Sequence, residues 1–393
     1  MLRSALLLAA FALVGAAPAP RATPARLTLA SDSEGTWVPF TLTPGNQLRF
    51  AMTLDGRPVS AILDTGVSGT VLARRYAEAN TLTLTAAGSA SAIGGSVAVA
   101  TVSTERLTLG GLVREGGTLS VVPLPAIATG SAQPVDLLVG RDLIGDYALD
   151  IDFVQHRFRL LPSGRMPFVG KAAPLSISPQ RQVYVGEVAL GGQRLRPMII
   201  DTGDGSAVTV TAAGWRAARL PGVATTTALA FGLAGQLETR IGIVPTLGTG
   251  ELTARNVEVR IEPAGGFSEQ VGVAGRIGTG FLQRYRVLLD PRAGRMVLTP
   301  GPDADAMPAR STSGLLMGLA RDRLRVLHVM AGGPAAVAGW RAGEEICAVD
   351  GVPIAADYAT SPLARWTAGA AGRTVALTLC GGTTRQLTLR QFY

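Results

Sequence analysis

Two aspartates in the same short motif are the first candidates for chemistry. Asp-Thr-Gly occurs at 64–66 within SAILDTGVSGTVL, and again at 201–203 within PMIIDTGDGSAVTV. Each copy ends a hydrophobic run typical of a buried strand, where a lone carboxylate is costly unless it is paired or its pKa is shifted. If Asp64 and Asp201 lie side by side, they share one proton, and the pair can act on water as general base and general acid.

Matching surroundings indicate that the motif was duplicated together with a domain. DLLVGRDLIGDYALDIDFVQHRFRL aligns with AGRIGTGFLQRYRVLLDPRAGRMVL at nearly the same offset as the two motifs, with Gly140 over Gly278. Chance gives an Asp-Thr-Gly tripeptide roughly once in a few thousand positions, so two copies in matching context indicate a repeat. We place the first copy at residues 33–163 and the second at 175–300.

The elements around both motifs are expected to be strands. Thr, Val, Leu and Gly are abundant and 24 prolines separate short apolar runs, which favours a mainly β chain. Two copies packed about a pseudo-twofold axis would bring Asp64 and Asp201 together. Thr65 and Thr202 could then hydrogen-bond to the opposite loop, and Gly66 and Gly203 would let the backbone approach the carboxylates.

AILDTGVSGTVL followed by DLLVGRDLIG resembles the retropepsin-like aspartic proteases. The resemblance implies two β-barrel lobes related by pseudo-twofold symmetry, with Asp64 and Asp201 activating a water that cleaves a peptide bond. In this family a hydrophobic-hydrophobic-Gly segment supports the active-site loop, a role that falls here to Leu138, Val139, Gly140, Ile277 and Gly278.

The second copy departs from the family pattern at two positions. Arg276 stands where a hydrophobic residue is expected, and Asp204 follows the second motif where the first has Val67. Asp204 is a candidate modulator of the dyad, because a third carboxylate would raise the pKa of the pair or favour basic substrates. Alternatively, Asp204 turns outward and caps a turn.

Two glycine-bearing segments correspond to the hairpins that close over substrate in this family. They are GSASAIGGSV in the first copy and FGLAGQLETR in the second.

The last ninety residues have a different pattern. After a linker at 301–312, SGLLMGLARDRLRVLHVMAGGPAAVAGWRAGEEICAVDGVPI resembles a bacterial PDZ domain, which we place at 313–393 with an α+β fold. Such domains bind peptide termini by adding a strand to a sheet edge. The residues expected to receive that terminus are Gly314, Leu315, Leu316 and Met317.

Cys347 and Cys380 are the only cysteines, and both lie in this last domain. They are a candidate disulfide, with two buried free thiols as the alternative, because spacing alone does not fix the geometry a disulfide needs.

The sequence lacks the residues that a serine protease or a metal enzyme would need. His156 and His328 are the only histidines and no serine nucleophile motif occurs, which argues against a serine triad and against a metal site. No cofactor is implied. The net charge of +8 is scattered without a basic tract, so nucleic acid is not an expected partner.

The N-terminus, MLRSALLLAAFALVGAAPAP, has the layout of a secretory signal peptide, which we place at 1–19. No later segment is apolar enough for a transmembrane anchor. The sequence therefore predicts a periplasmic or secreted aspartic endopeptidase, with a monomer sufficient for activity and a PDZ domain that recruits substrates or regulates access. The alternative is a non-catalytic periplasmic peptide-binding or scaffold protein on a protease fold.

Overall fold

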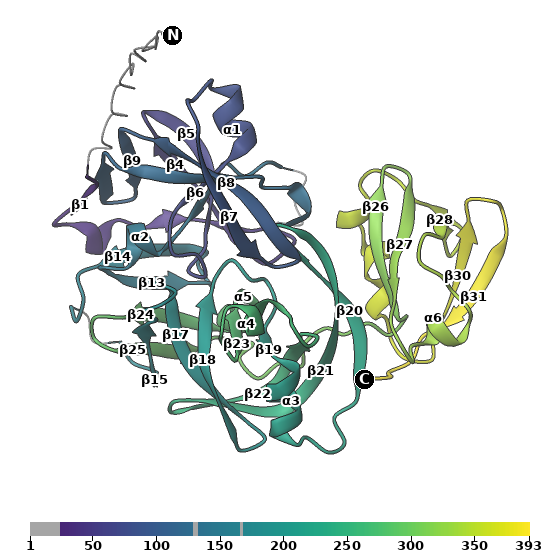
Figure 1. Ribbon diagram of the computed structural model, residues 1–393. Helices are drawn as coiled ribbons and strands as arrows, with labels where there is room; N and C mark the ends of the chain where they lie inside the picture. Colours follow the sequence, from purple (N-terminus) through teal and green to yellow (C-terminus); the bar gives the residue numbers. More distant parts are fainter. Residues whose placement is uncertain (1–23, 129–132, 166–167) are drawn as a thin grey trace, which may run out of the picture.

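The computed structural model describes residues 24–128, 133–165 and 168–393, which form a mainly β structure (Figure 1). The expected signal peptide lies outside these residues. Within the described ranges, no helix is both long enough and apolar enough to cross a membrane.

The first sheet carries the first aspartate motif. Strand β4 alternates buried and more exposed residues, whereas the end of β5 is fully buried, as expected for a strand that enters the core. The strands lie in the order β1 (Arg26–Leu29), β10 (Leu112–Glu115), β9 (Arg106–Leu109), β4 (Leu48–Leu54), β5 (Arg57–Leu63), β12 (Leu137–Val139), β6 (Val71–Ala73), β11 (Thr118–Val122), β8 (Gly95–Ser103), β7 (Thr85–Ala92), with β3 (Thr41–Leu42) beside β4.

The second sheet carries the second motif. Its strands lie in the order β16 (Ser176–Ile177), β17 (Tyr184–Leu190), β18 (Gln193–Asp201), β23 (Gly275–Gly278), β19 (Val208–Val210), β22 (Leu252–Ile261), β21 (Gly235–Thr249), β20 (Thr225–Gly232). The order from β17 to β20 repeats the order from β4 to β7 in the first sheet, strand for strand. In both sheets the strand before the aspartate pairs in parallel with a short strand from much later in the chain, β12 or β23.

A third sheet joins the two halves. Strands β13 and β24 pair across the junction, with Leu149 opposite Leu289 and Ile151 opposite Val287, and all four side chains belong to one continuous core. The order is β15 (Lys171–Pro174), β25 (Arg295–Pro300), β24 (Tyr285–Asp290), β13 (Ala148–Asp152), β14 (Arg157–Leu161), β2 (Val38–Pro39). This shared core holds the two motif-bearing sheets in a fixed relation.

Helices are short and lie at strand ends. Helices α2 and α5 begin directly after Gly140 and Gly278, next to the motif loops. The α-helices are α1 (Arg74–Ala79), α2 (Arg141–Ile144), α3 (Ala212–Ala218), α4 (Phe267–Gln270), α5 (Thr279–Leu282) and α6 (Pro334–Val337), and the 3-10 helices are η1 (Ser33–Gly35), η2 (Ala126–Ala128), η3 (Tyr358–Thr360) and η4 (Pro362–Ala368).

The C-terminal residues form a separate sheet with its own hydrophobic core. Cys347 and Cys380 are joined by a disulfide, S–S 2.01 Å, which links β28 to the residue after β30. The strand order is β26 (Leu315–Ala320), β27 (Arg323–Val329), β28 (Glu345–Val349), β30 (Thr374–Leu379), β31 (Thr384–Thr388), with β29 (Val352–Pro353) beside β28.

This C-terminal unit packs against strand β20 of the second sheet (Figure 1). The hydroxyl of Thr227 lies 2.8 Å from Nε2 of His328 and accepts a hydrogen bond from the N–H of Ala331 at 3.0 Å. The side chains of Ile241, Met330 and Tyr393 form a small apolar cluster at the same contact. The end of the chain is thus tied to the base of the β20–β21 hairpin.

Candidate active site

Both motif aspartates lie at the ends of buried parallel strands. Asp64 directly follows β5, and Asp201 is the last residue of β18. The N–H of Asp64 donates to the carbonyl of Val139 on β12 at 3.0 Å. Asp64 is 9% exposed and Asp201 is 8% exposed, so both carboxyl groups are nearly removed from bulk water while still lining a cleft.

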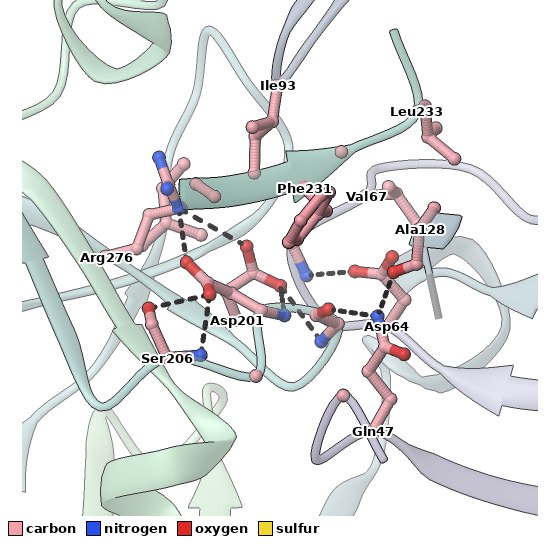
Figure 2. Close-up of a pocket in the computed structure, with 18 of the residues that line it drawn as sticks. Gln47, Asp64, Val67, Ile93, Ala128, Asp201, Ser206, Phe231, Leu233 and Arg276 are labelled. Atoms are coloured by element: carbon pink, nitrogen blue, oxygen red, sulfur yellow. Dashed lines mark hydrogen bonds and ion pairs between the residues drawn. The ribbon is translucent and has the colours of Figure 1, made fainter. Parts of the chain in front are cut away.

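The two loops face each other so closely that only glycine fits after each threonine. A Cβ atom at Gly66 would lie 2.4 Å from the carboxyl carbon of Asp201, and one at Gly203 would lie 2.3 Å from that of Asp64. Each glycine therefore makes room for the aspartate of the opposite motif. Figure 2 shows Asp64 and Asp201 next to each other at the base of the cleft.

The two threonines exchange hydrogen bonds across the junction. The hydroxyl of Thr65 donates to the carbonyl of Ile200 at 2.6 Å and accepts from the N–H of Thr202 at 3.0 Å. The hydroxyl of Thr202 donates to the carbonyl of Leu63 at 2.7 Å and accepts from the N–H of Thr65 at 3.1 Å. Both threonines are fully buried, so these four bonds fix the separation of the two aspartates.

Thr202→Val should destabilise the protein, because it leaves the N–H of Thr65 and the carbonyl of Leu63 buried without partners. Each lost partner costs about 1–3 kcal/mol, so the two together should lower the free energy of unfolding by about 2–6 kcal/mol in urea denaturation. The matched control is Thr41→Val, on the exposed side of β3, which should change stability by less than about 0.5 kcal/mol. Equal loss of stability in the two variants would mean that the hydrogen bonds between Thr65 and Thr202 and the opposite loops do not hold the two motifs together.

The five residues expected to support the motif loops lie on or directly after the short strands beside β5 and β18. Gly140 and Gly278 each touch the loop that follows a motif. A Cβ atom at Gly140 would lie 2.6 Å from the carbonyl carbon of Gly69, and one at Gly278 would lie 2.3 Å from the carbonyl oxygen of Ser206. The remaining three occupy the short parallel strands beside β5 and β18: Leu138, Val139 and Ile277.

Asp204 points inward and is paired with a cation. Its Oδ2 lies 2.8 Å from Nε of Arg276, and its side chain is 11% exposed. Its Oδ1 accepts from the N–H and the hydroxyl of Ser206, at 2.9 and 2.7 Å, so it also caps the loop after the second motif. Asp204 therefore lies beside the dyad and also caps a turn, but the expectation that it turns outward to do so is wrong.

Burial and charge repulsion raise the pKa of both aspartates. The pKa of Asp64 lies well above its usual value because of burial first and the neighbouring Asp201 carboxyl second. Burial raises the pKa of Asp201 to about 6, with a further rise from Asp204 and an opposing decrease from Arg276. Burial alone would raise the pKa of Asp204, but the Arg276 charge and the hydrogen bonds of Ser206 and Arg276 hold it below its usual value. Around neutral pH the pair can carry one proton, as acid–base chemistry on water requires.

The aspartates line a cleft of about 1470 Å³, which is larger than the roughly 300–1,000 Å³ typical of small-molecule pockets. The β7–β8 and β20–β21 hairpins cover it, and their tips meet through a hydrogen bond from the N–H of Ala234 to the carbonyl of Ile93 at 3.1 Å. In Figure 2, Ile93 and Phe231 lie above Asp64 and Asp201. These hairpins coincide with the two glycine-bearing segments singled out in the sequence.

Gln47 is a site residue that the sequence did not reveal. Its amide Nε2 donates to the carbonyl of Gly203 at 2.9 Å and to that of Ala128 at 3.1 Å. The first of these bonds joins the start of β4 to the second motif. No motif surrounds it, and a single glutamine before a strand carries no sequence signal.

The residues expected to bind a peptide terminus lie in the C-terminal unit and do not line the cleft. Gly314 adopts a positive φ of 75° just before β26, which lies at the edge of its sheet and pairs with β27 alone among the described strands. Leu315 is buried in the core of this unit, whereas Leu316 and Met317 are half-buried.

Residues 50–143 match a protein-family model described as aspartyl protease. The match contains the first motif and its supporting segment at 138–140, and ends before the second motif. It supports peptidase activity for the chain. No curated protein matches the chain. Among the described residues, no group of three or more His, Cys, Asp or Glu side chains is placed to hold a metal ion.

Proposed function

We propose that the chain is an exported aspartic endopeptidase in which Asp64 and Asp201 activate one water between them. One observation carries the proposal: two carboxyl groups with raised pKa values face each other at the base of a covered cleft of about 1470 Å³. The aspartyl protease match at 50–143 supports the peptidase part.

Residues 33–163 and 175–300 act as two retropepsin-like lobes of one duplicated domain in this proposal. The repeated strand order and the reciprocal bonds of Thr65 and Thr202 support it. One chain then supplies both halves of the site, so a monomer is sufficient for catalysis.

The reaction needs no covalent intermediate. The ionised carboxylate of the pair takes a proton from water as the water oxygen attacks the scissile carbonyl, and the protonated carboxyl donates to the developing oxyanion. Transfer of a proton to the leaving nitrogen then breaks the carbon–nitrogen bond. The two hairpins hold an extended peptide over the pair and exclude bulk water.

Digestion of a diverse peptide library tests this function directly. Cleavage products should appear from near pH 6 upward into the neutral range, because the pKa of Asp201 is raised to about 6, and pepstatin, an inhibitor of aspartic proteases, should suppress them. The competing function is a peptide-binding scaffold, which the departures at Asp204 and Arg276 favour. Peptides that bind in the cleft and remain uncleaved at every pH would support the scaffold function.

The C-terminal residues 313–393, reached through the linker 301–312, act in this proposal as a PDZ domain. Within the described parts of the chain, β26 pairs with β27 alone, so its other edge can receive an extended peptide as an added strand. The N–H groups of Thr312 and Ser313 donate to the carbonyl of Thr367 on η4, at 2.9 and 3.1 Å, which fixes the loop that precedes this edge. A peptide terminus would meet Gly314, Leu315, Leu316 and Met317, and bring its chain to the protease.

Because this unit packs on β20, it also restrains the hairpin that covers the cleft. Thr227→Val removes the hydrogen bonds to His328 and Ala331. Amide hydrogen exchange in β20 and β21 should then accelerate roughly 30-fold, since each of the two lost bonds is worth about 1 kcal/mol. Thr85→Val, at the start of β7 in the other hairpin, is the control and should leave β20 and β21 unchanged. Unchanged exchange in Thr227→Val would show that the contact does not restrain the hairpin.

A further inference from the structure

Among the described residues, a buried cluster of one cation and two anions lies beside the second aspartate and not beside the first. Nε of Arg276 is 2.8 Å from Oδ2 of Asp204, and its Nη1 is 2.7 Å from Oε1 of Glu262. The same Nε is 3.9 Å from Oδ2 of Asp201 (Figure 2). The side chains of Arg276 and Glu262 are 3% and 2% exposed, so the charges act through a medium of low polarity.

The corresponding positions of the first repeat are all uncharged. Arg276 lies opposite Ile199 in the second sheet, and Leu138 lies opposite Ile62 in the first. The position of Asp204 is the one directly after the motif in each repeat. The position of Glu262 is the one directly after β22, which pairs with β19 as β11 pairs with β6. The first repeat therefore has Val67, Pro123 and Leu138 where the second has Asp204, Glu262 and Arg276.

Backbone donors are distributed in the same unequal way. Oδ1 of Asp201 accepts from the N–H groups of both Gly203 and Asp204, each at 3.0 Å. Oδ1 of Asp64 accepts from the N–H of Gly66 at 3.0 Å, and no ion pair involves Asp64 within the described part of the chain. Two N–H donors and a nearby guanidinium stabilise a carboxylate more than one N–H donor does, so negative charge is favoured at Asp201.

We propose that Arg276, held in place by Asp204 and Glu262, is a positioning residue that makes Asp201 the ionised carboxylate and leaves the shared proton on Asp64. The proposal rests on the proposed peptidase function and assigns the two roles within it. It follows that Asp201 takes the proton from water as the oxygen–carbon bond forms, while the Asp64 proton passes to the carbonyl oxygen. Asp201 then passes its proton to the leaving nitrogen as the carbon–nitrogen bond breaks. The collapsing hydroxyl returns a proton to Asp64, so both groups regain their starting state.

The two acids of the cluster have separate tasks. Glu262 accepts from Arg276 and from the N–H of Ser268 at 2.9 Å, which anchors the guanidinium from the side away from the dyad. Asp204 orients Nε toward the dyad, and its own negative charge opposes ionisation of Asp201. Removing the cation and removing this anion should consequently affect Asp201 in opposite directions.

The first test measures proton occupancy and needs no catalysis. Aspartate carboxyl carbons are labelled with ¹³C, and their resonances are followed from pH 3 to 9 in the full chain. Asp64→Asn and Asp201→Asn identify the two signals by their loss. The larger part of the chemical-shift change in the first ionisation step should belong to Asp201. A larger change at Asp64 would overturn the assignment, and this holds even if the protein cleaves nothing.

The second test uses opposite shifts of the acidic limb of kcat/KM. Arg276→Gln should move the pH of half-maximal activity upward by about one unit or more, and Asp204→Asn should move it downward by about one unit. Arg276→Lys keeps the charge and should move it less than Arg276→Gln. General structural damage would lower activity at all pH values without opposite shifts. Shifts in the same direction, or no shift in either variant, would overturn the role of Arg276. If Arg276→Gln fails to fold, Asp204→Asn and the carboxyl titration of the unmodified chain decide the question.

Discussion

Asp64→Asn should lower kcat/KM for peptide cleavage by about 10³-fold or more, because general acid–base catalysis contributes typically 10²–10⁴-fold and here uses the pair as a unit. Asparagine has nearly the same shape as aspartate, but its amide does not ionise and cannot donate or accept the proton that the reaction transfers. The reciprocal bonds of Thr65 and Thr202 remain in the variant, so the fold and the cleft should persist. Initial rates on a fluorogenic peptide from the library, measured beside thermal unfolding, check both expectations.

Asp146→Asn is the matched control for this variant. It makes the same chemical change at a carboxylate that is 63% exposed and contacts only Arg292 among the described ion pairs. Its activity should stay within about twofold of the unmodified protein, as for most exposed substitutions. If Asp64→Asn retained full cleavage, the dyad would not be the catalytic group. If the unmodified protein and Asp64→Asn bound peptides equally and neither cleaved them, the scaffold function would be correct.

Activity should fall about tenfold for each pH unit below about 6, because the pKa of Asp201 is raised to about 6 by burial and by the Asp204 carboxylate. Below this pH both members of the pair hold a proton, and no base remains to take one from water. Above it, one carboxylate is ionised while Asp64, with its pKa well above the usual value, still holds its proton. The active range should therefore begin near pH 6 rather than in strongly acidic solution. A profile of kcat/KM from pH 3 to 9 measures this limb.

Binding of an uncleavable peptide analogue over the same pH range is the control. Its affinity should change far less than kcat/KM between pH 4 and 6, because the loss concerns proton transfer and not the shape of the cleft. Full activity at pH 4 would contradict the raised pKa of Asp201. A parallel fall in affinity and kcat/KM would instead place the titrating group in peptide binding.

Local sequence patterns determined the strand class and the positions of the candidate catalytic residues. Alternating apolar runs that end in Asp-Thr-Gly predict strands that enter a core, and β5 and β18 do so. The two motifs and the two aligned segments that follow them lie at nearly the same offset, which predicts a repeat, because a motif and its supporting strand must keep their spacing to pack together. The supporting residues at 138–140 and 277–278 were named from the family resemblance, in which a hydrophobic-hydrophobic-Gly segment follows each motif.

Contacts between distant residues were not encoded in any such pattern. Arg276 disturbed a hydrophobic motif in the sequence, but only the fold brings it to Asp204 and Glu262. Likewise, the amide of Gln47 meets the second motif across 156 residues, and Thr227 meets His328 across 101. A local pattern reports which face of a strand is buried, because burial depends on neighbours within a few residues. It does not report which charged side chain from a distant strand or loop will lie beside it in the fold.

The sequence by itself thus determined that this chain carries two aspartates on equivalent strands. The tertiary structure decided that they are unequal. Hydrophobic periodicity places a side chain inside the core, but the energy of a buried charge depends on the few groups within about 4 Å, and these come from elements far apart in the chain.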